Sequence, residues 1–192
     1  MEAFLWSTGV VALGEMGDKT QLLALVLATR FKRPWTIVAG IAVATVVNHA
    51  LAGLLGHWIA LQLGATTLRW VVGLGFIVMA AWMLVPDRID DDDDARRGGH
   101  WGVFATTVIA FFLAEMGDKT QLATVALAAR FADLPSVVAG TTAGLLLADA
   151  PVVWLGDALS HRLPMRWLHR LAALLMATMG ALALLDVGRV FD

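Results

Sequence analysis

Apolar residues run along the chain in six long segments, separated by short polar stretches. Each segment is close to or longer than the roughly 20 residues that a helix needs to cross the hydrocarbon layer of a membrane. The pattern predicts membrane-spanning helices at 3–30, 35–60, 67–86, 101–130, 135–159 and 167–187. Most tryptophans lie near the proposed helix ends, where the side chain prefers the headgroup level, although scattered core tryptophans would give the same pattern. The sequence therefore predicts an all-α polytopic membrane protein with six transmembrane helices.

One strongly polar stretch, "PDRIDDDDDARRGGH", divides the chain into two halves. The aspartates at 90–94 are interpreted as a solvated linker, or as a loop that raises the cation concentration near a pore mouth. The predicted organisation is a first three-helix repeat at 1–86, an acidic cytoplasmic linker at 87–100 and a second three-helix repeat at 101–192.

The two halves are related by an internal repeat. The octapeptide "EMGDKTQL" begins at Glu15 and again at Glu115, and Arg30-Phe31 matches Arg130-Phe131 at the same offset. Because each half has an odd number of predicted spans, the second half enters the membrane in the opposite sense. This predicts an inverted-topology repeat, the layout of many secondary transporters.

Composition supports lipid as the solvent of this chain. It is 59% hydrophobic, with a mean hydropathy of +0.74, and a soluble core of this size could not hide so much apolar surface. The net charge of −2 says nothing about nucleic acid, but the sequence has no basic patch, and we expect no nucleic-acid partner. The absence of cysteine excludes disulfides and thiolate metal sites. The start "MEAFLW" has no basic residue, so we expect the first segment to be a mature helix, not a cleaved signal.

Basic residues predict the orientation, because cytoplasmic loops carry an excess of lysine and arginine. The predicted topology places a larger and a smaller set of basic residues on opposite sides of the membrane. It therefore predicts a cytoplasmic linker, with both termini outside. The larger set is Arg30, Lys32, Arg33, Arg88, Arg96, Arg97, Arg162, Arg166 and Arg170, and the smaller is Arg69, Arg130 and Arg189.

The repeated motif places charges deep in the predicted membrane layer. Glu15 lies about twelve residues into its helix, about 18 Å deep in a layer of roughly 30 Å. A charge at that depth costs at least about 2.5–3.5 kcal/mol. Glu15 and Asp18 are predicted to share a helix face, and Lys19 is spaced to pair with Glu15. Gly17 permits close helix approach, or a local break that exposes carbonyls.

If the repeats face each other, the motif acids converge on one pseudo-symmetric metal site: Glu15, Asp18, Glu115 and Asp118. With the two motif lysines they leave two negative charges, which one divalent cation or protons would neutralise. A site that exchanges an ion for protons is the core of an antiporter. Alternatively, the charges form buried salt bridges that lock the halves together, although such pairs are poor stabilisers.

The available ligands favour Mn²⁺ or Ca²⁺. They are oxygens, and Mg²⁺ sheds its water reluctantly. His49, near mid-depth, is a ligand, a proton relay or a structural residue; its repeat counterpart Asp149 belongs to the pathway or forms a helix-pairing hydrogen bond. Met16 and Met116 are expected to pack away from the acids. The supporting or proton-pathway residues are predicted to be Lys19, Lys119, Thr20, Thr120, Gln21, Gln121, Asn48, His49 and Asp149.

The doubled motif resembles the Glu-x-Gly-Asp-Lys/Arg-Thr/Ser signature of the Golgi-type manganese and calcium transporter family, whose bacterial branch includes MneA-type manganese exporters. The resemblance extends over nearly the whole chain through the acidic linker, "NHALAGLLG" and "DAPVVWLG". It implies a six-helix protein of the bacterial inner membrane that exports Mn²⁺ or Ca²⁺ in exchange for protons, with the motif acids as the cation site. Asp149 departs from the asparagine expected in this branch, which puts coupling and selectivity in question.

We therefore expect a Mn²⁺/proton antiporter without a cofactor, working as a monomer or homodimer in the lipid bilayer. A Ca²⁺/proton antiporter is the nearest alternative. An intramembrane acid hydrolase is a further one, opposed by the lysine beside each motif aspartate. The remaining alternatives are a passive cation channel and a purely structural membrane protein.

Overall fold

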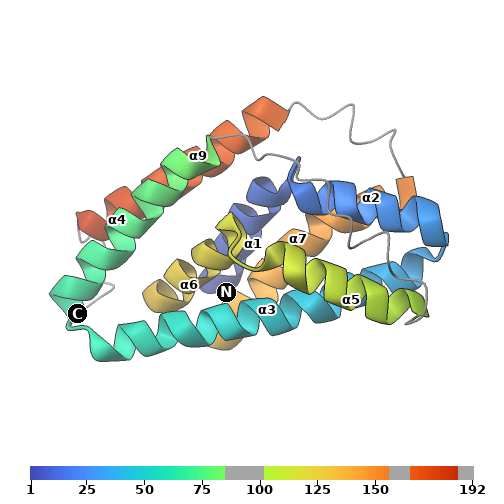
Figure 1. Cartoon of the computed structure of the whole chain (residues 1–192). Helices are drawn as coiled ribbons and strands as arrows, with labels where there is room; N and C mark the ends of the chain where they lie inside the picture. Colours follow the sequence, from blue (N-terminus) through green and yellow to red (C-terminus); the bar gives the residue numbers. More distant parts are fainter. Residues whose placement is uncertain (85–101, 156–164, 186–192) are drawn as a thin grey trace.

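The computed structural model describes residues 1–84, 102–155 and 165–185, which are helical almost throughout (Figure 1). The predicted all-α class is confirmed. The acidic linker at 87–100 lies outside the described residues. In chain order the helices are α1 (Glu2–Glu15), α2 (Lys19–Phe31), α3 (Pro34–Gln62), α4 (Ala65–Met83), α5 (Gly102–Glu115), α6 (Lys119–Phe131), α7 (Leu134–Leu155) and α9 (Met165–Leu184).

The predictions of single helices over 3–30 and 101–130 are wrong, because each segment is broken within the repeated motif. Gly17 has φ 86° and Gly117 has φ 75°, a left-handed conformation that glycine adopts without steric cost. The next residue in each half, Asp18 or Asp118, has an extended backbone and occupies the N-cap position of the following helix. Each half therefore has two short helices that meet at the motif.

The other predicted helices are found, with shifted ends. The segment at 35–60 is part of the 29-residue helix α3, which begins with Pro34 in its first turn. Among the described residues, three helices are long and apolar enough to cross a membrane: Pro34–Gln62, Ala65–Trp82 and Leu134–Leu155. Helices α2 and α6 are each followed by a C-cap residue with positive φ, Lys32 or Ala132. The two halves therefore share the same helix ending.

Close helix crossings recur at the offset of one hundred residues. A Cβ atom added at Gly40 would lie 2.7 Å from the Cβ of Thr107 and 3.2 Å from the carbonyl oxygen of Phe104. One added at Gly140 would lie 2.5 Å from the carbonyl oxygen of Phe4. The α3–α5 and α7–α1 crossings therefore use matching glycines, because only glycine lets the helices come this close.

Helices α4 and α9 run side by side as a separate pair (Figure 1). They cross tightly, since a Cβ atom at Gly180 would lie 2.8 Å from the carbonyl oxygen of Gly73. The pair packs on one side: α4 contacts α6 and α9 contacts α1. Phe76 and Met176 accordingly share an apolar cluster with Leu127.

This packing breaks the internal symmetry. Within the described chain, the counterpart pairs α9–α2 and α4–α5 are not among the helix pairs with appreciable contact. The α4–α9 pair therefore lies against one helix from each half and is displaced from its counterparts.

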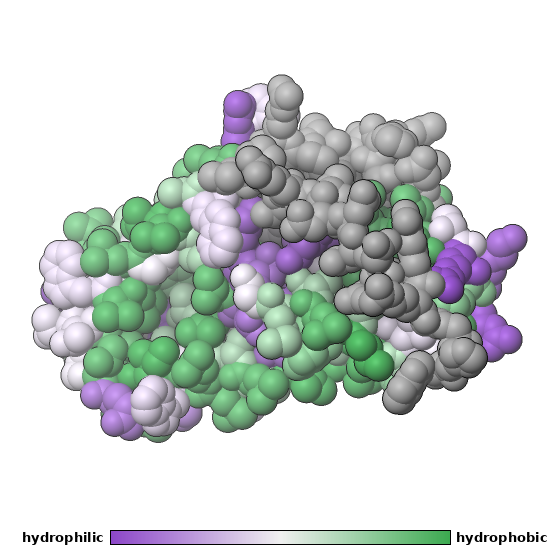
Figure 2. Space-filling model, in the orientation of Figure 1, coloured by the Kyte–Doolittle hydropathy of each residue, from purple (hydrophilic) through white to green (hydrophobic). Residues whose placement is uncertain are grey.

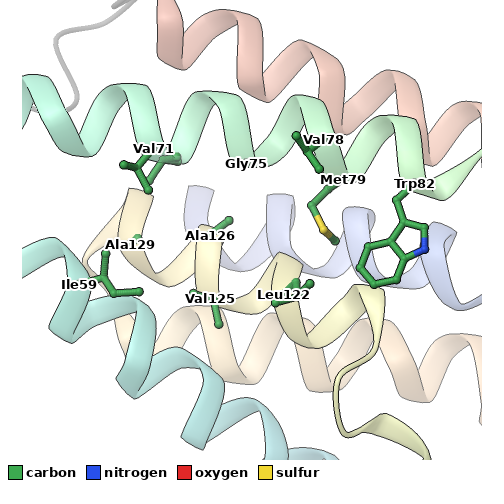
Figure 3. Close-up of a pocket in the computed structure, with 11 residues that line it drawn as sticks. Ile59, Val71, Gly75, Val78, Met79, Trp82, Leu122, Val125, Ala126 and Ala129 are labelled. Carbon is green, nitrogen blue, oxygen red and sulfur yellow. The ribbon is translucent and has the colours of Figure 1, made fainter.

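An apolar cavity of about 360 Å³ lies between α4 and α6, with α3 beside one end (Figure 3). Its walls include Val78 and Trp82 from α4, and Leu122 and Val125 from α6. Figure 2 shows that hydrophobic residues cover most of the visible described surface, with hydrophilic residues gathered near its centre. The α4–α6 contact is thus looser than the glycine crossings elsewhere.

Candidate metal centre

The two helix breaks bring acids from both halves of the chain together. Glu15 and Glu115 are the last residues of α1 and α5, and both are fully buried. One carboxylate oxygen each of Glu15, Glu115 and Asp118 lie within 4.8 Å of one another. Asp18 is also buried, at 6% exposure, but is not part of this group of three. Three of the four predicted ligands thus meet in one cluster.

Two predicted relations within the motif are corrected by the breaks. Glu15 and Asp18 do not share a helix face, because α1 ends at the first and α2 begins after the second. Lys19 approaches the other half instead of Glu15, with its Nζ atom 3.8 Å from Oδ1 of Asp118. The ion pair therefore links the two repeats across the centre.

Each motif threonine holds the glutamate of its own repeat. The Thr20 hydroxyl donates to Oε2 of Glu15 at 2.7 Å, and the Thr120 hydroxyl donates to Oε2 of Glu115 at 3.2 Å. Oε1 of both glutamates is buried and has no hydrogen-bond partner in the described chain. One oxygen of each carboxylate is thus oriented, and the other is open to an ion or a proton.

Each motif glutamine joins its helix break to the opposite repeat. Oε1 of Gln21 accepts from the Gly17 N–H at 3.0 Å, and its Nε2 donates to the Ala148 carbonyl at 2.9 Å. Gln121 accepts from the Gly117 N–H at 2.7 Å and donates to the Asn48 side chain. The glutamines therefore fix the backbone that carries the acids.

Replacing Gln21 with alanine is expected to destabilise the protein by about 1–3 kcal/mol, because its hydrogen bonds with the Gly17 N–H and the buried Ala148 carbonyl are lost. A thermal unfolding series of the purified protein in detergent measures this loss. Gln62→Ala is the matched control, since that glutamine is exposed at the end of α3. Equal unfolding midpoints for the two variants would contradict the bridging role.

Two further polar residues reach the centre from α3 and α7. His49 is fully buried, and its Nε2 atom lies 3.8 Å from Oε2 of Glu115. Asp149, at the counterpart position, is also fully buried, and neither of its oxygens has a hydrogen-bond partner in the described chain. Asp149 interacts electrostatically with Glu15 and Glu115. The two halves therefore differ at this position, with an imidazole in the first and a carboxylate in the second.

The two motif lysines have different surroundings. The Lys119 ammonium lies 6.0 Å from the ring centre of Trp82, and Lys119 is 4% exposed. The Lys19 side chain is 36% exposed. Because Trp82 comes from α4, the displaced α4–α9 pair covers the second motif and leaves the first more open. Sequence reasoning placed Trp82 only near a helix end; no sequence signal links it to Lys119.

Met116 is 56% exposed, whereas the neighbouring Glu115 is fully buried. The Ala148 carbonyl, which accepts from Gln21, could not be predicted as part of the centre, because a backbone acceptor leaves no signal in the sequence.

The chemistry of this centre follows from buried negative charge. Carboxylates that have left water need a counter-charge, and a metal ion or protons supply it. The donor set suits a divalent cation.

Comparison with known proteins agrees with this chemistry. A family model described as "Divalent cation/proton antiporter GDT1" matches residues 3–91 and 103–189. A Vibrio cholerae protein named "Putative manganese exporter" is 45% identical over 181 residues, covering 92% of this chain and 89% of that protein. The Saccharomyces cerevisiae "Divalent cation/proton antiporter GDT1" is 23% identical over 227 residues, covering 91% and 80%. No solved structure gives a significant match.

The family match extends over most of the chain, and it explains why acids are buried among apolar helices. It identifies a transporter and overturns the alternative of an intramembrane hydrolase. The chain belongs to the GDT1 family of divalent cation/proton antiporters.

Proposed function

We propose that this protein exports Mn²⁺ from a bacterial cytoplasm in exchange for protons, through one centre that the two repeats share. The observation that carries this proposal is the meeting of Glu15, Glu115 and Asp118 within 4.8 Å at the two helix breaks. Asp18, which is also buried, completes the proposed ligand set. An ion and protons compete for these acids, and that competition couples their movements.

The helix arrangement supports an inverted repeat. Trp35 at the start of α3 lies against Trp154 near the end of α7, with ring centres 5.1 Å apart. A Cβ atom at Gly53 would meet Leu134 at the start of α7, so these long helices run antiparallel. In this proposal each broken pair, α1–α2 or α5–α6, forms one span with its break near the midplane. The protein then has six spans, outside termini and a cytoplasmic linker.

Manganese is favoured by the name of the Vibrio cholerae relative, which specifies that ion. Ca²⁺ is the second candidate, because the cluster around Glu15 offers mainly oxygen ligands, which Ca²⁺ also prefers. The protein is proposed to act in the inner membrane as a monomer or a homodimer, with the lipid bilayer as its surroundings.

The transport test uses purified protein in liposomes that contain a pH-sensitive dye. Mn²⁺, Ca²⁺ or Mg²⁺ is added outside in turn, and internal pH and metal uptake are followed together. We expect Mn²⁺ entry to drive proton release, with a smaller response to Ca²⁺ and the smallest to Mg²⁺. Liposomes without protein are the control.

The outcomes separate the candidates. A larger response to Ca²⁺ at equal concentration would favour the Ca²⁺/proton antiporter. Metal entry without a proton signal would identify a passive channel. No movement of any of the three ions would contradict the proposed function.

A further inference from the structure

The centre contains one side chain whose chemistry differs from that of the acids. His49 lies in the middle of α3, fully buried, and neither ring nitrogen has a hydrogen-bond partner in the described chain. Buried polar groups are normally satisfied, because leaving one unpaired costs about 1–3 kcal/mol. An imidazole used only for packing would be expected to find a donor or an acceptor. Its position therefore needs another explanation.

The imidazole points to a glutamate of the cluster. Its Nε2 atom is 3.8 Å from Oε2 of Glu115, too far for a hydrogen bond. Metal–ligand bonds are about 2.0–2.6 Å long, so one ion readily holds two atoms at that separation. His49 lies outside the group of three acids that meet within 4.8 Å, but Glu115 belongs to that group and also faces the imidazole. An ion placed between Nε2 of His49 and Oε2 of Glu115 would contact both side chains.

The repeat makes this side chain informative. The eight motif residues are identical in the two halves, whereas the facing position is His49 in one half and Asp149 in the other. Both side chains are fully buried. The centre therefore has one nitrogen donor where a symmetric site would have a second carboxylate, which changes the kind of ion that it prefers.

The geometry points to His49 as a nitrogen ligand of the transported ion, and hence to first-row transition ions as the preferred cargo over Ca²⁺ and Mg²⁺. This inference rests on the proposed function. Ca²⁺ and Mg²⁺ bind through oxygen and gain little from imidazole, whereas transition ions accept it readily. Because Mn²⁺ binds most weakly of the first-row series, Co²⁺ should compete with it more effectively than Ca²⁺ does.

The first experiment measures the ion directly. Purified protein is loaded with Mn²⁺, and pulsed electron paramagnetic resonance is used to detect coupling to an imidazole nitrogen. We expect that coupling in the wild type and its loss in His49→Gln. Wild-type Mn²⁺ bound without nitrogen coupling would overturn the inference and leave the proposed function intact.

The second experiment compares ion preference in liposomes. His49→Gln is expected to weaken the apparent affinity for Mn²⁺ at least about tenfold while changing that for Ca²⁺ less than about twofold. His57→Gln is the matched control, the same substitution two turns along α3, and should keep the wild-type ratio. An equal loss for both ions would indicate a structural role and overturn the inference. A wild type that neither binds nor moves any ion would overturn both this inference and the proposed function.

Discussion

Exchanging Glu115 for glutamine is expected to lower Mn²⁺ transport at least about a hundredfold. Glu115 is the residue on which the centre converges, since it belongs to the cluster of three acids, accepts from Thr120 and faces His49. Glutamine keeps the size of the side chain and one oxygen but removes the charge that an ion or a proton must neutralise. Rates of metal and proton movement in liposomes measure the effect.

Stability should respond differently from transport in this variant. Removing a buried carboxylate also removes a desolvation cost, so Glu115→Gln should unfold at or above the wild-type temperature. Glu2→Gln is the matched control, because Glu2 is exposed in the first turn of α1, and its transport should be unchanged. Wild-type transport by Glu115→Gln would refute the assigned centre. Lost transport together with a much lower unfolding temperature would assign the residue to folding.

Replacing Gly56 with alanine is expected to destabilise the protein by at least about 2–3 kcal/mol, because the added carbon has no room. It would lie 2.1 Å from the carbonyl oxygen of Val125 and 2.9 Å from the carbonyl carbon. Since those atoms belong to the backbone, α3 and α6 must move apart. That movement would also displace Asp118 at the start of α6. Thermal unfolding in detergent and the yield of monodisperse protein measure the loss.

Gly9→Ala supplies the comparison for this prediction. A Cβ atom there meets nothing within 4 Å, and alanine is the better helix former by about 1 kcal/mol. The Gly9 variant should therefore match or exceed the wild type in stability. If Gly56→Ala unfolds at the same temperature as Gly9→Ala, the close α3–α6 crossing described above is wrong.

The sequence predicts the helices well where one apolar run makes one helix. The run at 35–60 corresponds to α3 within two residues at each end, because nothing in it competes with helical geometry. The break at the motif is harder to see, although its signals are present. Gly17 and Asp18 are the residue types that end one helix and cap the next. A local break is one of the two interpretations of Gly17, but a single helix through the long apolar flanks places Glu15 and Asp18 on one face.

The partners of the motif residues could not be read from the sequence. The spacing of Glu15 and Lys19 suits a pair on one helix, yet Lys19 approaches Asp118 because the break turns it toward the other repeat. Likewise, the helical patterns of α4 and α9 do not say on which helices the pair rests. Such choices depend on packing between segments far apart in the chain, where several arrangements bury similar apolar areas.

The displaced position of the α4–α9 pair has a consequence for the free energy of the conformational change in transport. The pair packs on α6 and α1. The counterparts of these helices in the other half of the repeat are α2 and α5. We propose that the pair can also pack on those helices; two arrangements built from matching contacts would differ little in free energy, so that binding of an ion or a proton would shift their populations. The bias between them resides where the halves differ, as at His49 and Asp149. In this proposal, duplication gives two conformations of similar free energy, and the few residues that differ between the halves determine which conformation is favoured.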